Sequence, residues 1–279
     1  MGFLTKLEAR TARASSCLCI GLDPHPDQFP PGFSHDAKGL EAYGRLLLES
    51  TTPYAAAVKA NLAFFEAFGS AGLAVLERLR AHLPADIPFI ADAKRGDIGS
   101  TAERQAVALF DALGADAVTA SPYLGRDALA PLLDWPGGFV YVLCRTSNES
   151  AAQVQSLPVG NGGEPLYMAI AGLAGEWAGR RPNVGLVVGA TAPIEMARVR
   201  QAAPALPFLV PGLGAQAGDL RAVQEHGPAI EPPAGRLRAG SLVVNVSRAI
   251  ARVARDPGQM DPGELLATAA AGWSARLRC

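Results

Sequence analysis

Short apolar runs recur along the chain, and each is followed by polar residues and then by a stretch with helical spacing. Eight such runs lie at 16–22, 55–60, 89–92, 115–120, 138–144, 184–190, 207–210 and 241–246. Their hydrophobicity is continuous rather than alternating, which is typical of parallel strands buried on both faces. Between them, segments such as 36–52 carry leucines at the spacing of one helix face. The pattern therefore predicts repeated β–α units.

Eight β–α units predict an α/β fold of the (β/α)8 TIM barrel type, formed as a single domain over residues 1–279. An open doubly wound sheet is the competing architecture, but it normally carries a glycine-rich phosphate turn after its first strand. Here the first strand ends in Asp23 and Pro24 instead. Two segments rich in glycine and proline remain. We interpret 156–165 as a flexible loop over the site and 227–240 as a surface insertion.

Charged side chains stand where the predicted strands end. Asp23 follows the first apolar run, Lys59 closes the second and Asp92 closes the third, with Lys94 two residues further on. Strand side chains two positions apart share a face, so Asp92 and Lys94 should emerge together. Asp97 comes from the turn behind them. Taken alone these charges would also fit a solvated loop with a salt bridge, but in a barrel all strand ends converge on one face.

The alternation of sign predicts acid–base chemistry at that face. Several ions in one cavity are costly to bury unless they are paired or meet a charged ligand. The flanking carboxylates favour the ammonium form of Lys94. We therefore expect Lys94 to donate a proton.

A second set of residues predicts a phosphate site across the barrel. Gly212, Gly214 and Gln216 follow the seventh apolar run, and Arg248 follows the eighth. These are the loops where this fold commonly binds phosphate, since glycines admit an anion close to backbone N–H groups and an arginine pairs with it. A plain glycine turn is the alternative. The coincidence with Arg248 favours a phosphate site.

Composition excludes several other classes of protein. The 279 residues include 25 Lys plus Arg against 26 Asp plus Glu, so there is no electrostatic footprint for nucleic acid or an anionic membrane. The four cysteines have neither disulfide nor zinc spacing, and no run approaches the roughly 18 apolar residues of a membrane span. We expect a soluble, cytoplasmic protein.

The ordered motifs are specific. They are GLDP at 21–24, Lys59, DAKRGDIGST at 92–101, SPYLG at 121–125, TSN at 146–148, PGLGAQ at 211–216 and NVSR at 245–248. With these motifs the chain resembles the orotidine 5'-phosphate decarboxylase family along nearly its whole length, in the longer form of the bacterial second type. Related decarboxylases and synthases share parts of the DxKxxD pattern, and the phosphate motifs and SPYLG favour this family over them.

The resemblance implies decarboxylation of orotidine 5'-monophosphate to UMP and carbon dioxide, the last step of de novo pyrimidine biosynthesis, without metal or organic cofactor. It implies that Lys59, Asp92, Lys94 and Asp97 form a charged array. In that array Asp92 lies beside the substrate carboxylate and Lys94 beneath C6 of the pyrimidine. Asp23 and Lys59 are expected to bind ribose hydroxyls.

Three further expectations rest on the resemblance alone. Ser147 is expected to contact the edge of the pyrimidine. The loop that carries Gln216 is expected to close over the phosphate. Asp97 and Thr101 are expected to reach into the neighbouring subunit's site, which implies a homodimer with shared active sites.

Two other functions remain as alternatives. A barrel aldolase would use Lys94 or Lys59 as a Schiff-base lysine, which is usually a neutral amine. A barrel that only binds a nucleotide monophosphate would need no proton donor beside a pair of carboxylates.

Overall fold

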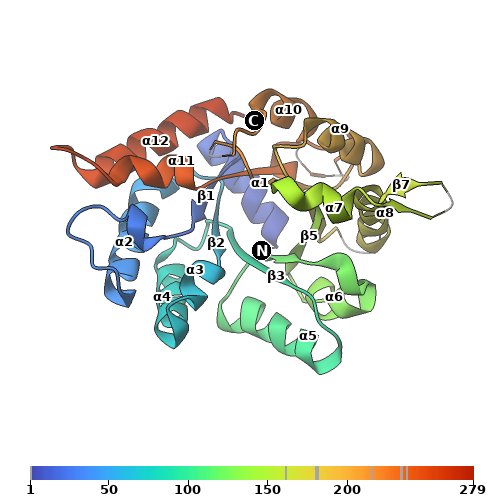
Figure 1. Ribbon diagram of the computed structural model, residues 1–279, viewed down its shortest axis with the longest axis horizontal. Coiled ribbons are helices and arrows are strands. Elements are labelled where there is room, and N and C mark those ends of the chain that lie inside the picture. The colour runs from blue at the N-terminus through green and yellow to red at the C-terminus, as the bar shows by residue number, and fades with distance from the viewer. Residues whose placement is uncertain (1, 161, 180–181, 215, 233–234, 237) are drawn as a thin grey trace.

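The computed structural model describes residues 2–160, 162–179, 182–214, 216–232, 235–236 and 238–279. Among these residues, eight parallel strands close into a barrel in the order β1-β10-β9-β8-β5-β4-β3-β2 (Figure 1). The strands are β1 Leu18–Leu22, β2 Ala57–Asn61, β3 Phe89–Arg95, β4 Ala117–Ala120, β5 Phe139–Arg145, β8 Val184–Val188, β9 Phe208–Val210 and β10 Leu242–Val246. Each predicted apolar run overlaps one strand. The predicted (β/α)8 barrel is confirmed.

Helices surround the strands and bury their outer faces (Figure 1). They are α2 Ala37–Thr51, α3 Ala63–Glu66, α4 Gly69–His82, α5 Gly99–Ala106, α6 Arg126–Leu133, α7 Ala152–Gln155, α8 Leu166–Ala178, α9 Pro193–Ala202, α10 Leu220–His226 and α11 Arg248–Ala251. The helix predicted over 36–52 is α2. Its N-cap Asp36 accepts hydrogen bonds from the backbone N–H groups of Lys38 and Gly39, both at 3.0 Å.

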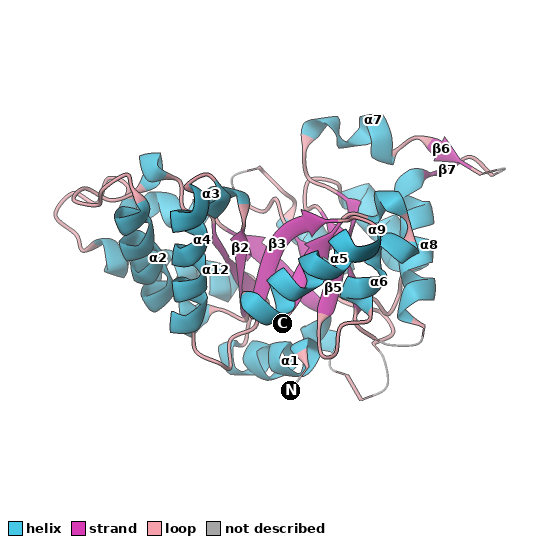
Figure 2. Cartoon of the chain, turned by 90° about the horizontal axis from the view of Figure 1, so that it is seen from below, coloured by secondary structure: helices cyan, strands magenta, loops and turns pink. Residues whose placement is uncertain are grey.

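Two helices at the ends of the chain were not among the predicted elements. They are α1 Phe3–Ala14 and α12 Pro262–Arg276. Figure 2 shows α1 lying across one end of the barrel, opposite the end that carries α7. The buried Phe3 ring lies 4.8 Å from the ring of Phe139 inside the barrel. Helix α1 therefore closes the amino end of the strands with apolar side chains.

Side chains inside the barrel form layers, because strand residues point alternately in and out. The amino-end layers are apolar and form one cluster with α1. Its strand members are Cys19, Ala57, Ile90, Ala117, Phe139, Tyr141, Val187, Leu209 and Val243. Positions two residues further along the strands form the next layer, toward the carboxyl ends.

Both glycine- and proline-rich segments contain local structure that the sequence did not predict. Residues 156–165 contain a two-stranded antiparallel hairpin, β6 Pro158–Val159 with β7 Glu164–Pro165, because its two arms pair their backbones. Within 227–240, Ala229 is fully buried and its N–H donates to Ser241 Oγ at 2.7 Å. The start of that segment therefore packs into the protein rather than projecting from it. Residues 161, 233, 234 and 237 of these segments lie outside the described residues.

Candidate active site

The barrel interior changes from apolar to polar at its carboxyl end. Lys59 and Asp92 come two residues after the interior side chains of Ala57 and Ile90. Thr119 follows the interior residue Ala117 of β4 by the same two positions. The period of two that buries the apolar layer therefore also aims these polar side chains inward.

A cavity of about 460 Å³ opens above this polar layer. Its volume is within the range of sites for small ligands. The structure brings most of the predicted site residues to its wall: Asp23, Lys59, Asp92, Lys94, Ser147, Gly212, Gln216 and Arg248. They come from the carboxyl ends of strands that are far apart in the sequence, as the barrel topology requires.

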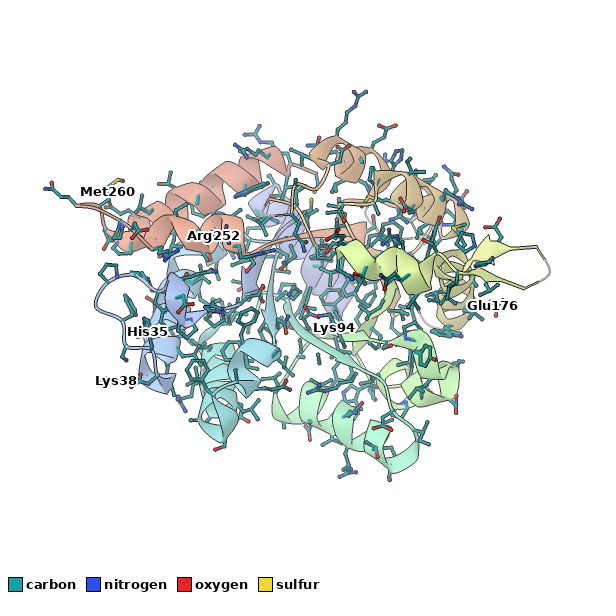
Figure 3. The ribbon with its side chains drawn as sticks, viewed as in Figure 1. His35, Lys38, Lys94, Glu176, Arg252 and Met260 are labelled. Atoms are coloured by element: carbon teal, nitrogen blue, oxygen red, sulfur yellow. The ribbon has the colours of Figure 1, made fainter. Side chains whose placement is uncertain are left out.

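Four of these side chains alternate in sign. The Nζ of Lys59 lies 3.8 Å from Asp23 Oδ1 and 2.9 Å from Asp92 Oδ2. The Nζ of Lys94 lies 2.6 Å from the other carboxylate oxygen, Asp92 Oδ1. The Lys94 side chain is 48% exposed, so its ammonium borders open space while it holds Asp92. In Figure 3, Lys94 lies near the middle of the molecule.

The pairing keeps the buried groups charged. Burial alone would raise the pKa of Asp92, but the ammonium groups of Lys59 and Lys94 outweigh burial and hold the pKa of that carboxyl well below its ordinary value. Burial alone would lower the pKa of Lys59, but Asp23 and Asp92 outweigh burial and raise that pKa. At neutral pH the array therefore presents an aspartate and a lysine that are both ionised.

The predicted phosphate residues divide into two groups. Gly212 lines the cavity with a left-handed φ of 95°, and a Cβ there would lie 2.9 Å from the Cβ of Ser147 and 3.0 Å from Gln216 Oε1. Only glycine fits that approach without displacement. Gly214 lies outside the described lining, and a Cβ on it would meet Ala249 and Trp273 instead. Gly212 faces the cavity, and Gly214 shapes the loop against the helices behind it.

Asp97 and Thr101 are not brought to the cavity within this chain. Asp97 Oδ1 accepts a hydrogen bond from the backbone N–H of Ile98 at 2.8 Å, and Thr101 is exposed on α5. Neither lies in the described wall of the cavity. Ile98 is an apolar side chain that is 62% exposed beside them. The surface around Asp97 is therefore open to another molecule.

Similarity to known proteins identifies the family to which this barrel belongs. The model of the orotidine 5'-phosphate decarboxylase / HUMPS family matches residues 16–260. The chain belongs to this family. The family predicted from the motifs is thereby confirmed.

Relatives agree with the family model over most of the chain. Orotidine 5'-phosphate decarboxylase of Thermomicrobium roseum is 48% identical over 252 residues, which cover 90% of this chain and 86% of that protein. Among solved structures, Leishmania donovani OMP decarboxylase is 40% identical with a TM-score of 0.82, covering 100% of this chain and 99% of the other. Leishmania donovani UMP synthase is 41% identical with a TM-score of 0.83, and the match covers 100% of this chain but 57% of that longer one.

The cavity wall also includes polar residues that were not among the predicted site residues. Asn61, Thr119 and Asn245 are three of them. Asn61 and Asn245 each follow an interior residue, Lys59 and Val243, by two positions, so the period of two could have identified them. The Oδ1 atom of Asn245 is buried with no hydrogen-bond partner among the described residues.

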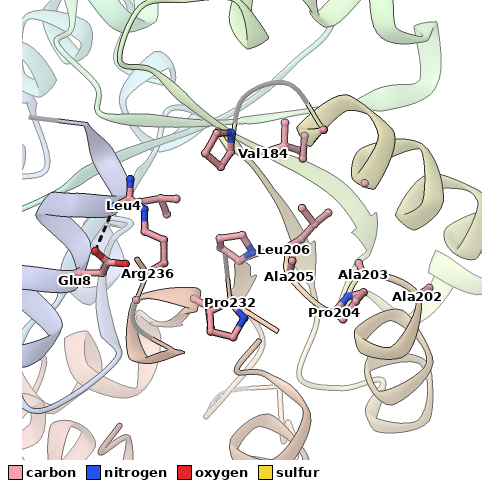
Figure 4. Close-up of a pocket in the computed structure, with 17 residues that line it drawn as sticks. Leu4, Glu8, Val184, Ala202, Ala203, Pro204, Ala205, Leu206, Pro232 and Arg236 are labelled. Atoms are coloured by element: carbon pink, nitrogen blue, oxygen red, sulfur yellow. Dashed lines mark hydrogen bonds and ion pairs between the residues drawn. The ribbon is translucent and has the colours of Figure 1, made fainter. Parts of the chain in front are cut away.

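A second cavity lies at the amino end of the barrel and differs in chemistry (Figure 4). Its volume is about 410 Å³ and its described wall is mainly apolar, with Pro204, Leu206 and Pro232. The charged residues described there, Glu8 and Arg236, pair with each other at 3.2 Å. Of these two cavities, the one at the carboxyl end has the alternating charges of Asp23, Lys59, Asp92 and Lys94 in its described wall, and it is therefore the candidate active site.

The described residues contain neither a cluster of metal ligands nor a membrane-spanning helix. No group of three or more His, Cys, Asp or Glu side chains in that part of the chain could hold a metal ion. No helix in the described ranges is long and apolar enough to span a membrane.

Proposed function

We propose that this chain is a carboxy-lyase that converts orotidine 5'-monophosphate into UMP and carbon dioxide, the last step of de novo pyrimidine biosynthesis. Its membership of the orotidine 5'-phosphate decarboxylase / HUMPS family and its 48% identity with the orotidine 5'-phosphate decarboxylase of Thermomicrobium roseum support the reaction. The observation that carries the mechanism is the half-exposed ammonium of Lys94, 2.6 Å from the buried carboxylate of Asp92. The proposal takes residues 1–279 as one functional domain.

The chemistry follows from that pair. The bond between C6 of the pyrimidine and its carboxylate breaks, carbon dioxide leaves and the electron pair stays on C6. The ammonium of Lys94 stabilises the developing negative charge and then transfers a proton to C6. Asp92 holds the ammonium and lies beside the substrate carboxylate, where like charges disfavour the bound ground state. These steps use residues of the protein and the substrate.

The rest of the cavity binds the nucleotide. Asp23 and Lys59 contact the ribose hydroxyls, and Ser147 contacts the pyrimidine edge. Four residues form the phosphate site: Gly212, Gly214, Gln216 and Arg248. Gly214 contributes through the shape of the loop rather than by direct contact. Closure of the Gln216 loop uses phosphate binding energy to hold the transition-state geometry.

The test of this function is decarboxylation by the chelator-treated protein, followed as loss of the orotate ultraviolet absorbance. Lys94→Ala should lower kcat by at least about 10³-fold, since it removes the proton donor. Lys38→Ala is the matched control, because Lys38 is exposed on α2 at the edge of the molecule (Figure 3). No decay with the wild type, or undiminished decay with Lys94→Ala, contradicts the proposal. The second result would show that Lys94 is not the proton donor.

Two ammonium groups argue against the aldolase alternative. A Schiff-base lysine reacts as a neutral amine. The pKa of Lys59 is raised by Asp23 and Asp92 despite its burial, and Lys94 donates to Asp92 at 2.6 Å. Borohydride treatment with carbonyl substrates should therefore leave both lysines unmodified, as mass spectrometry of the digested protein would show. Efficient trapping at Lys94 would favour the aldolase.

We also propose a homodimer in which Asp97 and Thr101 complete the partner's site. Support comes from their position outside this chain's own cavity and from the exposed apolar side chains of Ile98, 62%, and Tyr123, 84%, on the same rim. The four free cysteines of the chain fit a reducing cytoplasm. The substrate and a second copy of the chain are the expected partners, with no nucleic acid or membrane.

Subunit mixing tests the shared site. Lys94→Ala and Asp97→Ala should each be nearly inactive alone. After exchange of subunits, a hybrid has one site with both residues intact, so activity should recover to about a quarter of the wild-type value. If Asp97 served its own subunit, both sites of every hybrid would be defective and no activity would return.

A further inference from the structure

Strands β3 and β4 pair irregularly at the active site. Ala91 pairs with Val118 and Arg95 with Ala120, with a shift of register between them. Residues 92–94 of β3 therefore stand opposite the single residue Thr119 of β4. Such a bulge leaves backbone groups of the longer strand without partners in the ladder.

The side chain of Thr119 fills this gap. Its Oγ1 accepts a hydrogen bond from the backbone N–H of Lys94 at 3.0 Å. The same hydroxyl donates to Asp92 Oδ1 at 2.8 Å. Thr119 is 1% exposed, so water does not compete for either bond. One buried hydroxyl thus links the backbone of the proposed proton donor to the carboxylate that holds its ammonium.

The backbone of Lys94 needs such support. Its φ is 48°, in the left-handed region that side chains other than glycine rarely adopt. Unfavourable backbone conformations persist only where their surroundings fix them. The N–H of Lys94 points at Thr119 in this conformation, and the ammonium of Lys94 returns to Asp92 Oδ1 at 2.6 Å. The bulge and Thr119 together aim Lys94 into the cavity.

We infer that Thr119 is a positioning residue for decarboxylation, acting through Asp92 and Lys94. The inference rests on the proposed function of the same site. The backbone N–H can only donate and the ionised carboxylate can only accept, so the one hydroxyl proton of Thr119 is committed to Asp92. Thr119 therefore does not donate to the substrate. Its branched Cβ restricts χ1, which keeps the hydroxyl between its two partners.

The test compares Thr119→Val, which keeps the shape but removes the hydroxyl, with Thr119→Ser, which keeps the hydroxyl. Thr119→Val should lower kcat by about 10- to 100-fold, as expected for a lost hydrogen bond to a charged group. KM and the dissociation constant of UMP should change by less than about threefold, because the proposed ribose and phosphate contacts remain. Thr119→Ser should keep kcat within about fivefold of the wild type.

A buried threonine elsewhere provides the control. Thr51 is 0% exposed on α2 and its Oγ1 donates to the carbonyl of Leu47 at 2.6 Å. Thr51→Val removes a comparable hydroxyl far from the cavity and should leave kcat unchanged. If Thr119→Val does not fold, Thr119→Ala, which adds no atoms, takes its place with the same thresholds.

Two results overturn the inference. One is a kcat for Thr119→Val within twofold of the wild type, and the other is a loss in Thr119→Ser as large as that in Thr119→Val. Either result with an active wild type refutes the role of Thr119 and leaves the proposed function standing. A wild-type chain that leaves orotidine 5'-monophosphate intact refutes both.

Discussion

Replacing Lys59 with methionine should destabilise the fold through electrostatics rather than through packing. The side chain of Lys59 is 5% exposed, and its Nζ lies between Asp92 Oδ2 at 2.9 Å and Asp23 Oδ1 at 3.8 Å. Methionine has a similar length and fills a similar volume. Lys59→Met therefore removes a charge and leaves two carboxylates with Lys94 as the one remaining cation of the array.

The two distances from Lys59 Nζ to the carboxylates determine how large this loss of stability should be. With an effective dielectric constant near 20, separations of 2.9 and 3.8 Å correspond to attractions of about 6 and about 4 kcal/mol. The cost of burying the ammonium, several kcal/mol, opposes this attraction and disappears with the charge. The expected net loss of stability is about 3–5 kcal/mol, the range for removing one partner of a buried ion pair.

Urea unfolding at pH 7, followed by tryptophan fluorescence, measures this loss. Lys38→Met, on the exposed face of α2, is the matched control and should change the free energy of unfolding by less than about 0.5 kcal/mol. The double variant Lys59→Met/Asp92→Asn should be more stable than the sum of the single changes predicts, because it removes the unpaired charge. A Lys59→Met protein within about 1 kcal/mol of the wild type refutes the reasoning.

Three further changes test other parts of the site. For Asp92→Asn, the stability difference from wild type should be constant above pH 5 and shrink by about 1 kcal/mol by pH 3 in denaturant titrations. Because the native pKa of Asp92 is lowered, its carboxylate stabilises the fold at pH values above its unfolded pKa of about 4, and this stabilisation is lost on acidification. An unchanged difference contradicts the pairing. Tyr141→Phe should keep or raise the melting temperature, because the buried Oη has no partner among the described residues; a clear drop contradicts this. Gly212→Ala should weaken UMP binding at least about tenfold in calorimetry, given its φ of 95° and its approach to Ser147; wild-type affinity contradicts it.

The sequence contained enough information for the barrel and for the centre of the charged array. Continuous apolar runs mark strands buried on both faces, and their number indicates closure. Once the barrel is inferred, Asp23, Lys59 and Asp92 must converge, because all strands end at the same rim. Their distances confirm that convergence, with Lys59 within 4 Å of both carboxylates. The roles of these residues in catalysis stay predictions.

Other features depend on contacts that no local pattern encodes. Thr119 reads as one polar residue in an apolar strand, and its function is visible only once the bulge opposite it is known. Gly212 and Gly214 belong to one motif, yet one faces the cavity and the other faces Trp273, because the loop turns between them. Helix α1 carries no motif, but its Phe3 closes the barrel. In each case the tertiary neighbour decides, and it is distant in the sequence.

The four charged side chains differ in exposure, and this difference predicts which of them contribute to folding stability and which to turnover. The side chains of Asp23, Lys59 and Asp92 are 16%, 5% and 12% exposed, whereas that of Lys94 is 48% exposed. Asp92 receives hydrogen bonds from Lys59, Lys94 and Thr119, so its carboxylate is oriented before any substrate arrives. Such preorganisation avoids reorganisation during the reaction. The buried Lys59 should therefore contribute more to folding stability than Lys94 does, and the half-exposed Lys94 should contribute more to turnover. Lys59→Met and Lys94→Ala, compared in both assays, would reveal opposite rankings.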